Sequence, residues 1–252
     1  MATASRSGAR DLAGDSDSDI PEYLALAWHR ANDKRPGPRR RLDLRAIAAA
    51  GIALADVSGL DGVSMRSVGA QLDITSVGLY RYVHSKDELL ALMIDEALGP
   101  PDYPASAGDW RDQLSAWSHA ARARFEAHPW VLNVSLPDPP SLPNQIQWTE
   151  RGLDALESTR LGATEKLSVL LLVNVYVRGQ TQLASALQGP RPEDDAGARY
   201  ARLLLRLADP KRFPHLVTAM TEQAATPPAD FADDAFSFGL DTVLDGIARR
   251  VR

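Results

Sequence analysis

Apolar residues recur at helical spacing between residues 43 and 98, and this pattern restricts the fold more than any other feature of the chain. In the first such segment they stand at i, i+3, i+4, i+7, i+8 and i+11, which is one face of a helix. The positions are Leu44, Ile47, Ala48, Gly51, Ile52 and Ala55. Nowhere does the sequence show a convincing strict alternation of apolar and polar residues, the pattern of a half-buried strand. We therefore predict an all-α fold.

Proline and glycine divide the chain into three parts. Residues 1–33 begin with small and polar residues, so they are expected to be disordered apart from a possible short helix between residues 20 and 31. Pro36-Gly37-Pro38 stops that helix, and residues 34–98 form a basic arm followed by a small helical domain. Pro100-Pro101 marks the next boundary, and residues 99–252 are expected to form a larger helical domain.

Several classes of protein are disfavoured by composition. The chain has no cysteine, so it has no disulfide and no cysteine-ligated zinc, and a reducing compartment is the simpler interpretation. The apolar run 169–173 is far shorter than the roughly 20 residues of a membrane span. We expect a cytoplasmic protein without a membrane segment, metal site or cofactor.

Capping residues predict where the helices of the small domain begin. Asp43 can cap the first helix, Ser64 the second, and Thr75 or Ser76 the third. Gly59 can end the first helix in a left-handed conformation, and Asp73 tolerates that conformation at the next turn. The segment 85–88 reads as a capping box that opens a fourth helix. Short helices joined by tight turns are the geometry of a helix-turn-helix, whose recognition helix enters the major groove.

The third helix carries the side chains that favour nucleic-acid binding. Once Leu79 and Val83 point toward the core, small, tyrosine and arginine side chains are left on the other faces, where they can approach bases and phosphates. These residues are Ser76, Val77, Gly78, Tyr80, Arg81 and Tyr82, and Thr75 just before them is included in the predicted DNA-binding set. His84 and Lys86 stand at the start of the following helix, where free amides and a cation suit a phosphate. The alternative is that the two tyrosines only pack in the core.

A basic cluster precedes the small domain. Its members are Lys34, Arg35, Arg39, Arg40 and Arg41, with no acidic residue between them. Although the whole chain has a net charge of −5, such a local cluster can follow phosphates or enter a minor groove. The alternative is a solvated linker.

The segment 43–98 resembles the DNA-binding domain of the tetracycline-repressor (TetR) family. The stretches that carry the resemblance are Gly62 to Leu72, Val77 to Val83 and Ser85 to Leu90. The resemblance implies that the second helix opens at the DNA with Ser64, Met65 and Arg66, that the recognition helix contacts DNA, and that Lys86 contacts phosphate. Two residues depart from the family pattern: Gly69 replaces the usual alanine, and Asp73 replaces the usual turn glycine.

The larger domain contains two helical segments suited to burial and pairing. Residues 165–187 are apolar on almost every side, so this helix is expected to be buried on more than one side. Its polar residues Asn174, Arg178 and Gln182 recur every four positions, as either an interface stripe or ligand-binding groups. The segment 234–251 closes the chain with a second apolar helix. This half resembles, more loosely, the C-terminal domain of the tetracycline-repressor subgroup, which implies a homodimer formed through these two helices.

The same resemblance bears on the effector. Founding members of the subgroup bind magnesium–tetracycline through histidines, but none of the five histidines here lies in segment 95–103, and Ser135 stands where another is expected. A hydroxyl is a poor substitute for imidazole as a metal ligand. The expected ligand is instead small and mainly apolar. Its candidate contacts, for which simple core packing of the tryptophans is the alternative, are Trp117, Trp130, Asn133, Trp148, Asn174 and Arg178.

Taken together, the residues and the resemblance predict a transcriptional regulator. We expect a repressor that binds a palindromic double-stranded DNA operator as a homodimer and is released by a small-molecule effector. An enzyme is disfavoured, since the chain has no nucleophile elbow, phosphate-binding glycine loop or paired-histidine metal motif. An activator and a ligand-independent DNA-binding protein of the same fold remain as alternatives.

Overall fold

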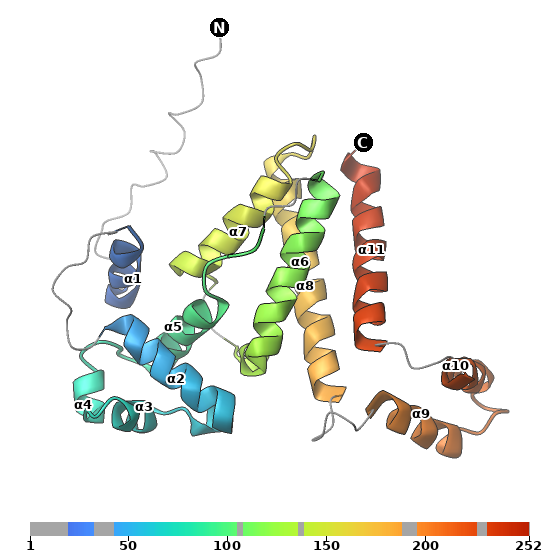
Figure 1. Ribbon diagram of the computed structural model, residues 1–252, viewed down its shortest axis with the longest axis horizontal. Helices are drawn as coiled ribbons and strands as arrows, with labels where there is room; N and C mark the ends of the chain where they lie inside the picture. Colours follow the sequence, from blue (N-terminus) through green and yellow to red (C-terminus); the bar gives the residue numbers. More distant parts are fainter. Residues whose placement is uncertain are drawn as a thin grey trace, which may run out of the picture. The chain divides into compact units, whose positions relative to one another are not determined.

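The computed structural model describes residues 20–32, 43–104, 108–135, 139–187, 196–225 and 231–251, and within these residues every regular element is a helix (Figure 1). The chain divides into two compact units. Unit 1 comprises residues 1–96 and 136–146, and unit 2 comprises residues 97–135 and 147–252. The predicted all-α fold is confirmed. None of the described helices has the length and apolar character needed to cross a membrane.

Unit 1 is built on short helices. In chain order they are α1 (Glu22–Asn32), α2 (Leu44–Ser58), the 3₁₀ turn η2 (Leu60–Gly62), α3 (Met65–Gln71), α4 (Ser76–Leu79) and α5 (Lys86–Leu98), whose last two residues belong to unit 2. Ile47, Val68 and Leu79 bring α2, α3 and α4 together in one core, and each of these side chains is fully buried. Val83 and Leu89 are buried with them, so Leu79 and Val83 point inward as predicted.

The predicted caps set the helix starts in unit 1. The Asp43 carboxylate accepts a hydrogen bond from the Ala46 amide at 2.8 Å, and the Thr75 hydroxyl accepts one from the Gly78 amide at 3.1 Å. At α3 the Ser64 and Ser67 side chains each accept from the other's backbone amide, which makes a complete capping box. These bonds satisfy amides that a helix leaves without an internal partner.

The turn between α3 and α4 explains both departures from the family pattern. Asp73 has a φ of +54°, the left-handed conformation that the sequence predicted for it. Gly69 is buried where the chain doubles back: its carbonyl accepts from the Ile74 amide at 2.9 Å, and a Cβ added to it would lie 3.0 Å from the Ile74 oxygen. The missing side chain therefore allows the close approach of the two backbone segments.

A tryptophan fixes the amino-terminal helix within unit 1. The Trp28 indole nitrogen on α1 donates a hydrogen bond to the Ser141 carbonyl at 2.9 Å, and Tyr23 of the same helix is buried. Trp28 itself stays partly exposed, so its ring combines an apolar contact with one directional bond. The short helix considered for residues 20–31 is present, and residues 1–19 lie outside the described part of the chain.

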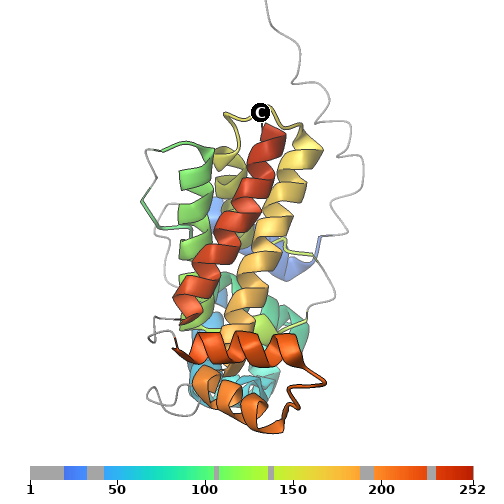
Figure 2. The same cartoon turned by 90° about the vertical axis from the view of Figure 1, so that its right-hand side faces the viewer.

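Unit 2 is larger and contains the longest helices. They are α6 (Trp110–Ala127), the 3₁₀ turn η3 (Pro129–Asn133), α7 (Pro143–Ala155), α8 (Ala163–Leu187), α9 (Ala196–Leu207), α10 (Pro214–Ala225) and α11 (Phe231–Val251). The first four residues of α7 belong to unit 1. Helices α6, α8 and α11 lie side by side, as both ribbon views show (Figure 2), and α9 packs on α10.

The contact between α8 and α11 depends on one tyrosine and one glycine. The Tyr176 hydroxyl of α8 donates a hydrogen bond to the Phe236 carbonyl at 2.7 Å. A Cβ at Gly239 would lie 2.3 Å from that hydroxyl oxygen, so only glycine leaves room for the tyrosine. Helices over residues 165–187 and 234–251 were predicted from the sequence; in the structure they begin two and three residues earlier.

Candidate nucleic-acid interface

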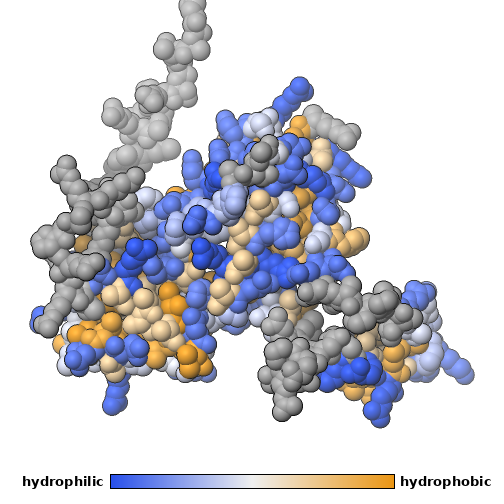
Figure 3. All heavy atoms as spheres, in the orientation of Figure 1, coloured by the Kyte–Doolittle hydropathy of each residue, from blue (hydrophilic) through white to orange (hydrophobic). Residues whose placement is uncertain are grey.

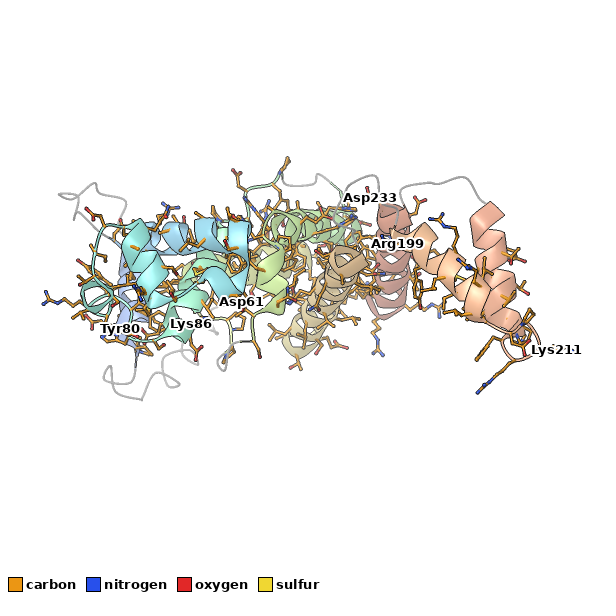
Figure 4. The ribbon with its side chains drawn as sticks, turned by 90° about the horizontal axis from the view of Figure 1, so that it is seen from below. Asp61, Tyr80, Lys86, Arg199, Lys211 and Asp233 are labelled. Atoms are coloured by element: carbon orange, nitrogen blue, oxygen red, sulfur yellow. The ribbon has the colours of Figure 1, made fainter. Side chains whose placement is uncertain are left out.

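Helices α3 and α4 place a mixed polar and apolar set of side chains at the surface of unit 1. Val77 is 71% exposed and Tyr80 is 48% exposed, which is unusual for a large side chain beside a well-packed core. The other exposed members of the predicted set are Ser64, Arg66, Thr75, Arg81, His84 and Lys86. Ser76, Gly78 and Tyr82 are half-buried. Figure 4 labels Tyr80 and Lys86, which both come from this part of the chain.

The chemistry of this surface fits the edge of a DNA duplex. Arg66, Arg81 and Lys86 are cations that can pair with phosphates, and an arginine can also pair bidentately with guanine. The exposed Val77 can contact the methyl group of thymine, and the Tyr80 hydroxyl can reach a phosphate. The helical part of α4 is only four residues long, because residues 80–82 continue as a turn rather than as α-helix.

Met65 does not share this surface. Its side chain is only 8% exposed, although the sequence analysis included it among the DNA-binding residues. Met65 is the first residue of α3, and there the helix turns its apolar side chains inward, as it does with Val68 one turn later. Its burial points to a core role, and this correction leaves Ser64 and Arg66 on either side as the exposed residues at the start of α3.

The start of α5 is capped differently from the sequence prediction. The Ser85 hydroxyl accepts from the Glu88 amide at 3.1 Å, as a capping box requires. However, the Glu88 carboxylate accepts from the His84 amide at 2.7 Å and also lies 3.5 Å from the His84 ring. The His84 amide, at the helix start where free amides were expected, is therefore already bound within the chain, while the Lys86 side chain is exposed.

The basic arm stays a prediction. Arg39, Arg40 and Arg41 lie outside the described residues, so their contribution to binding is a matter for experiment.

The left-handed Asp73 gives a test of the helix-turn-helix geometry. Asp73→Ala is expected to lower the free energy of unfolding by about 1 kcal/mol, because a left-handed residue with a Cβ is strained and alanine lacks the side-chain oxygen that lets aspartate bond locally. Asp73→Gly is the matched control and is expected to be at least as stable as the wild type. Chemical denaturation measures both, and equal losses in the two variants would contradict the assigned turn.

In unit 2 the tryptophans named as candidate ligand contacts are buried. The Trp117 indole donates to the Trp148 carbonyl at 2.9 Å, and the Trp148 indole donates to the Gly99 carbonyl at 3.0 Å. The two rings also meet edge-on, with 5.8 Å between their centroids, and Tyr103 stacks on Trp148. Trp130 is buried separately in η3. These contacts give Trp117 and Trp148 a packing role whether or not they also touch a ligand.

The polar candidates lie along one flank of α8. Asn174 and Arg178 are half-buried, and Gln182 donates to the Leu132 carbonyl and to the Asn133 side chain, each at 3.3 Å. The Arg178 guanidinium lies over the Phe125 ring of α6, 5.2 Å from its centroid. The structure thus brings two of the six predicted ligand residues, Trp117 and Trp148, into direct contact. Asn133 instead meets Gln182, and Asn174 and Arg178 lie one turn apart along α8.

Other charged side chains of unit 2 have clear structural roles. Arg111 on α6 pairs with Asp241 and Asp245 on α11, and Arg122 pairs with Glu126 and Asp233. Among the described residues no cluster of three histidine, aspartate or glutamate side chains is arranged to hold a metal ion.

Comparison with known proteins identifies the family. Residues 101–251 match the family model described as the tetracyclin repressor-like, C-terminal domain. The HTH-type transcriptional repressor DrrR1 of Streptomyces coeruleorubidus is 32% identical, with 96% of this chain and 90% of that protein covered. The HTH-type transcriptional repressor Rv1353c of Mycobacterium tuberculosis is 26% identical, with 86% of each covered.

Solved structures agree with this assignment. The TetR family protein ActR of Streptomyces coelicolor, in complex with actinorhodin, matches with a TM-score of 0.70 and 25% identity over 83% of this chain and 97% of that one. The relatives are named as regulators of transcription and not as enzymes. The match to the family model covers more than half of the chain, and the repressor of S. coeruleorubidus covers nearly all of it. The chain therefore belongs to the tetracycline-repressor (TetR) family of transcriptional regulators.

Proposed function

We propose that the protein is a repressor that binds a palindromic operator as a homodimer and leaves it when a small, mainly apolar ligand binds. The proposal is supported mainly by the exposed side chains at α3 and α4, where Arg66, Val77 and Tyr80 lie at the surface of a helix-turn-helix. Each chain offers one such surface, so a two-fold dimer requires an inverted repeat.

The proposed dimer forms through the exposed faces of α8 and α11. Six large apolar side chains of these helices are between 52% and 77% exposed, although the opposite side of α8 is packed in the core. They are Leu167, Leu171, Leu172, Val175 and Leu183 of α8 and Phe238 of α11. Figure 3 shows hydrophobic residues reaching the surface of unit 2 among hydrophilic ones. A set of exposed apolar side chains of this size indicates an interface with another protein.

The nature of the effector is supported by the side chains of unit 2 and by a relative. Tryptophan, phenylalanine and amide side chains suit an apolar molecule with a few polar groups. The related ActR has been crystallised in complex with actinorhodin. Ser135, where a metal-binding histidine was expected, disfavours magnesium–tetracycline.

Arg66→Ala tests the DNA-binding surface. If the guanidinium makes a bidentate contact to a base, its loss is expected to weaken operator binding by about 1–3 kcal/mol. The operator is first found by selecting duplexes from a random pool, and the affinity is then measured by fluorescence anisotropy at fixed salt. Tyr80→Phe removes only a phosphate contact and should cost less. Unchanged affinity in both folded variants would place the DNA surface elsewhere.

The direction of regulation is a separate question from binding. An activator of the same fold would bind its operator in the same way, because the effect depends on where the operator lies relative to the promoter. A reporter gene driven by the chain's own operator distinguishes the two: we expect higher expression when the repressor is deleted. A ligand-independent regulator would bind the operator equally in the presence of every compound tested.

A further inference from the structure

Arg178 of α8 is partly buried, and it forms no ion pair with an acidic residue in the described part of unit 2. Among the described arginines of this unit, it is the one whose pKa is lowered by burial. Arg111 and Arg122 each pair with two carboxylates, and Arg151 pairs with Asp154. Arg178 forms no ion pair and no hydrogen bond with any described residue. The face of its guanidinium lies over the Phe125 ring.

The surroundings of Arg178 are polar but uncharged on its own helix. Asn174 lies one turn before it and Gln182 one turn after it, so three side chains with hydrogen-bond donors share one flank of α8. Phe125, below the guanidinium, is 3% exposed. Burial lowers the pKa of the Arg178 guanidinium, and no carboxylate offsets that effect.

A partly buried guanidinium without an anion lowers the stability of the folded protein unless a ligand binds to it. A partly buried cation without an anion is destabilising, and cation–π attraction to one ring compensates only in part. The stacked geometry occupies the face of the guanidinium and leaves its edge, with five N–H donors, for another group. A carboxylate is a group whose geometry matches two of those donors at once.

We propose that Arg178 binds a carboxylate of the effector, so that the ligand of this regulator is an apolar organic acid. The inference rests on the proposed function, since it takes unit 2 to be the effector domain. Asn174 is positioned to add a hydrogen bond next to the carboxylate. The apolar part of the ligand would lie against the aromatic side chains of unit 2, with Phe125 nearest to the guanidinium.

The test compares a carboxylate with its neutral analogue. Anthraquinone-2-carboxylate and anthraquinone-2-carboxamide have the same ring system and differ in charge, and their binding to the full-length protein is measured by calorimetry and by thermal shift. We expect the acid to bind the wild type roughly 10- to 100-fold more tightly than the amide, as for a charge-assisted pair of hydrogen bonds. Arg178→Met keeps an apolar contact with Phe125 and should abolish the preference for the acid.

Two further measurements distinguish a ligand-binding role of Arg178 from a structural role. Without ligand, Arg178→Met is expected to melt no lower than the wild type, since it removes an unpaired charge; a clearly lower melting temperature or a loss of dimer would assign the arginine a structural role and overturn the proposal. Arg160→Met, which removes an exposed charge of the same unit, is the matched control and should keep the preference for the acid.

The remaining outcomes are equally decisive. Equal affinity of the acid and the amide for the wild type, or no binding of either at millimolar concentration, would refute a carboxylate site at Arg178. Operator binding by the ligand-free variants is measured in parallel and should equal that of the wild type. If no variant and no wild-type protein binds any operator, the proposed function fails, while the comparison of acid and amide still decides the role of Arg178.

Discussion

Val175→Asp is expected to convert the protein from a dimer to a monomer and to reduce operator affinity at least a hundredfold. Val175 lies near the middle of the exposed apolar face of α8 and is 58% exposed in the single chain. A carboxylate there would have to be buried without a partner if two copies of this face met. Once the subunits separate, each half-site is bound singly, and the gain from linking two binding events is lost.

Sedimentation velocity and operator titration measure the two effects together. The control is Val57→Asp, which places the same charge at an exposed valine of α2 in unit 1 and should leave the dimer intact. A Val175→Asp protein that stays dimeric would show that the α8 face is not the subunit interface. A monomer that still binds a full palindrome with wild-type affinity would contradict the proposal that operator binding requires the dimer.

Local signals in the sequence predicted the small domain well, because its geometry is set by residues close together in the chain. The caps at Asp43, Ser64 and Thr75 each involve a bond spanning three residues, and the left-handed Asp73 is a property of one turn. Such bonds can be foreseen without knowing the tertiary structure. The inward direction of Leu79 and Val83 followed in the same way from helical spacing.

Predictions that depended on long-range packing were weaker. Met65 was expected at the DNA from the family resemblance, but in unit 1 its side chain is buried in the core. The stacking of Arg178 on Phe125 joins residues 53 positions apart in sequence, and no spacing rule predicts it. Helices α9 and α10 were not predicted individually; from the sequence they were expected only as part of the larger helical domain of residues 99–252.

Asp95 was missed although the sequence contained a signal for it. It follows six consecutive apolar residues, 89–94, in a helix that the structure buries on nearly all sides. An acid in such a run must either face solvent or find hydrogen-bond donors inside the protein. The structure shows the second outcome: Asp95 is 8% exposed, and its carboxylate accepts from the Gln145 amide at 2.9 Å, near the start of α7.

Burial raises the pKa of Asp95 from its usual 3.8 to about 6, against the opposing effect of the hydrogen bonds from residues 144 and 145, while the nearby Glu96 raises the pKa further. The native state therefore binds a proton more tightly than the unfolded chain does. The stability that this group contributes is complete below about pH 4 and is lost as the pH rises through about 6. A difference of about two pKa units corresponds to roughly 3 kcal/mol.

Asp95→Asn is consequently expected to change the pH dependence of folding. Because an amide does not ionise but still offers an oxygen to the Gln145 amide, the variant should gain stability relative to the wild type as the pH rises from 4 to 7, by up to about 3 kcal/mol. Urea denaturation at a series of pH values measures this difference. Asp61→Asn, which removes an exposed carboxylate of the same unit, should keep the wild-type profile. If the difference between Asp95→Asn and the wild type is the same at every pH, Asp95 ionises as freely in the native protein as in the unfolded chain, and its burial carries no energetic penalty at neutral pH.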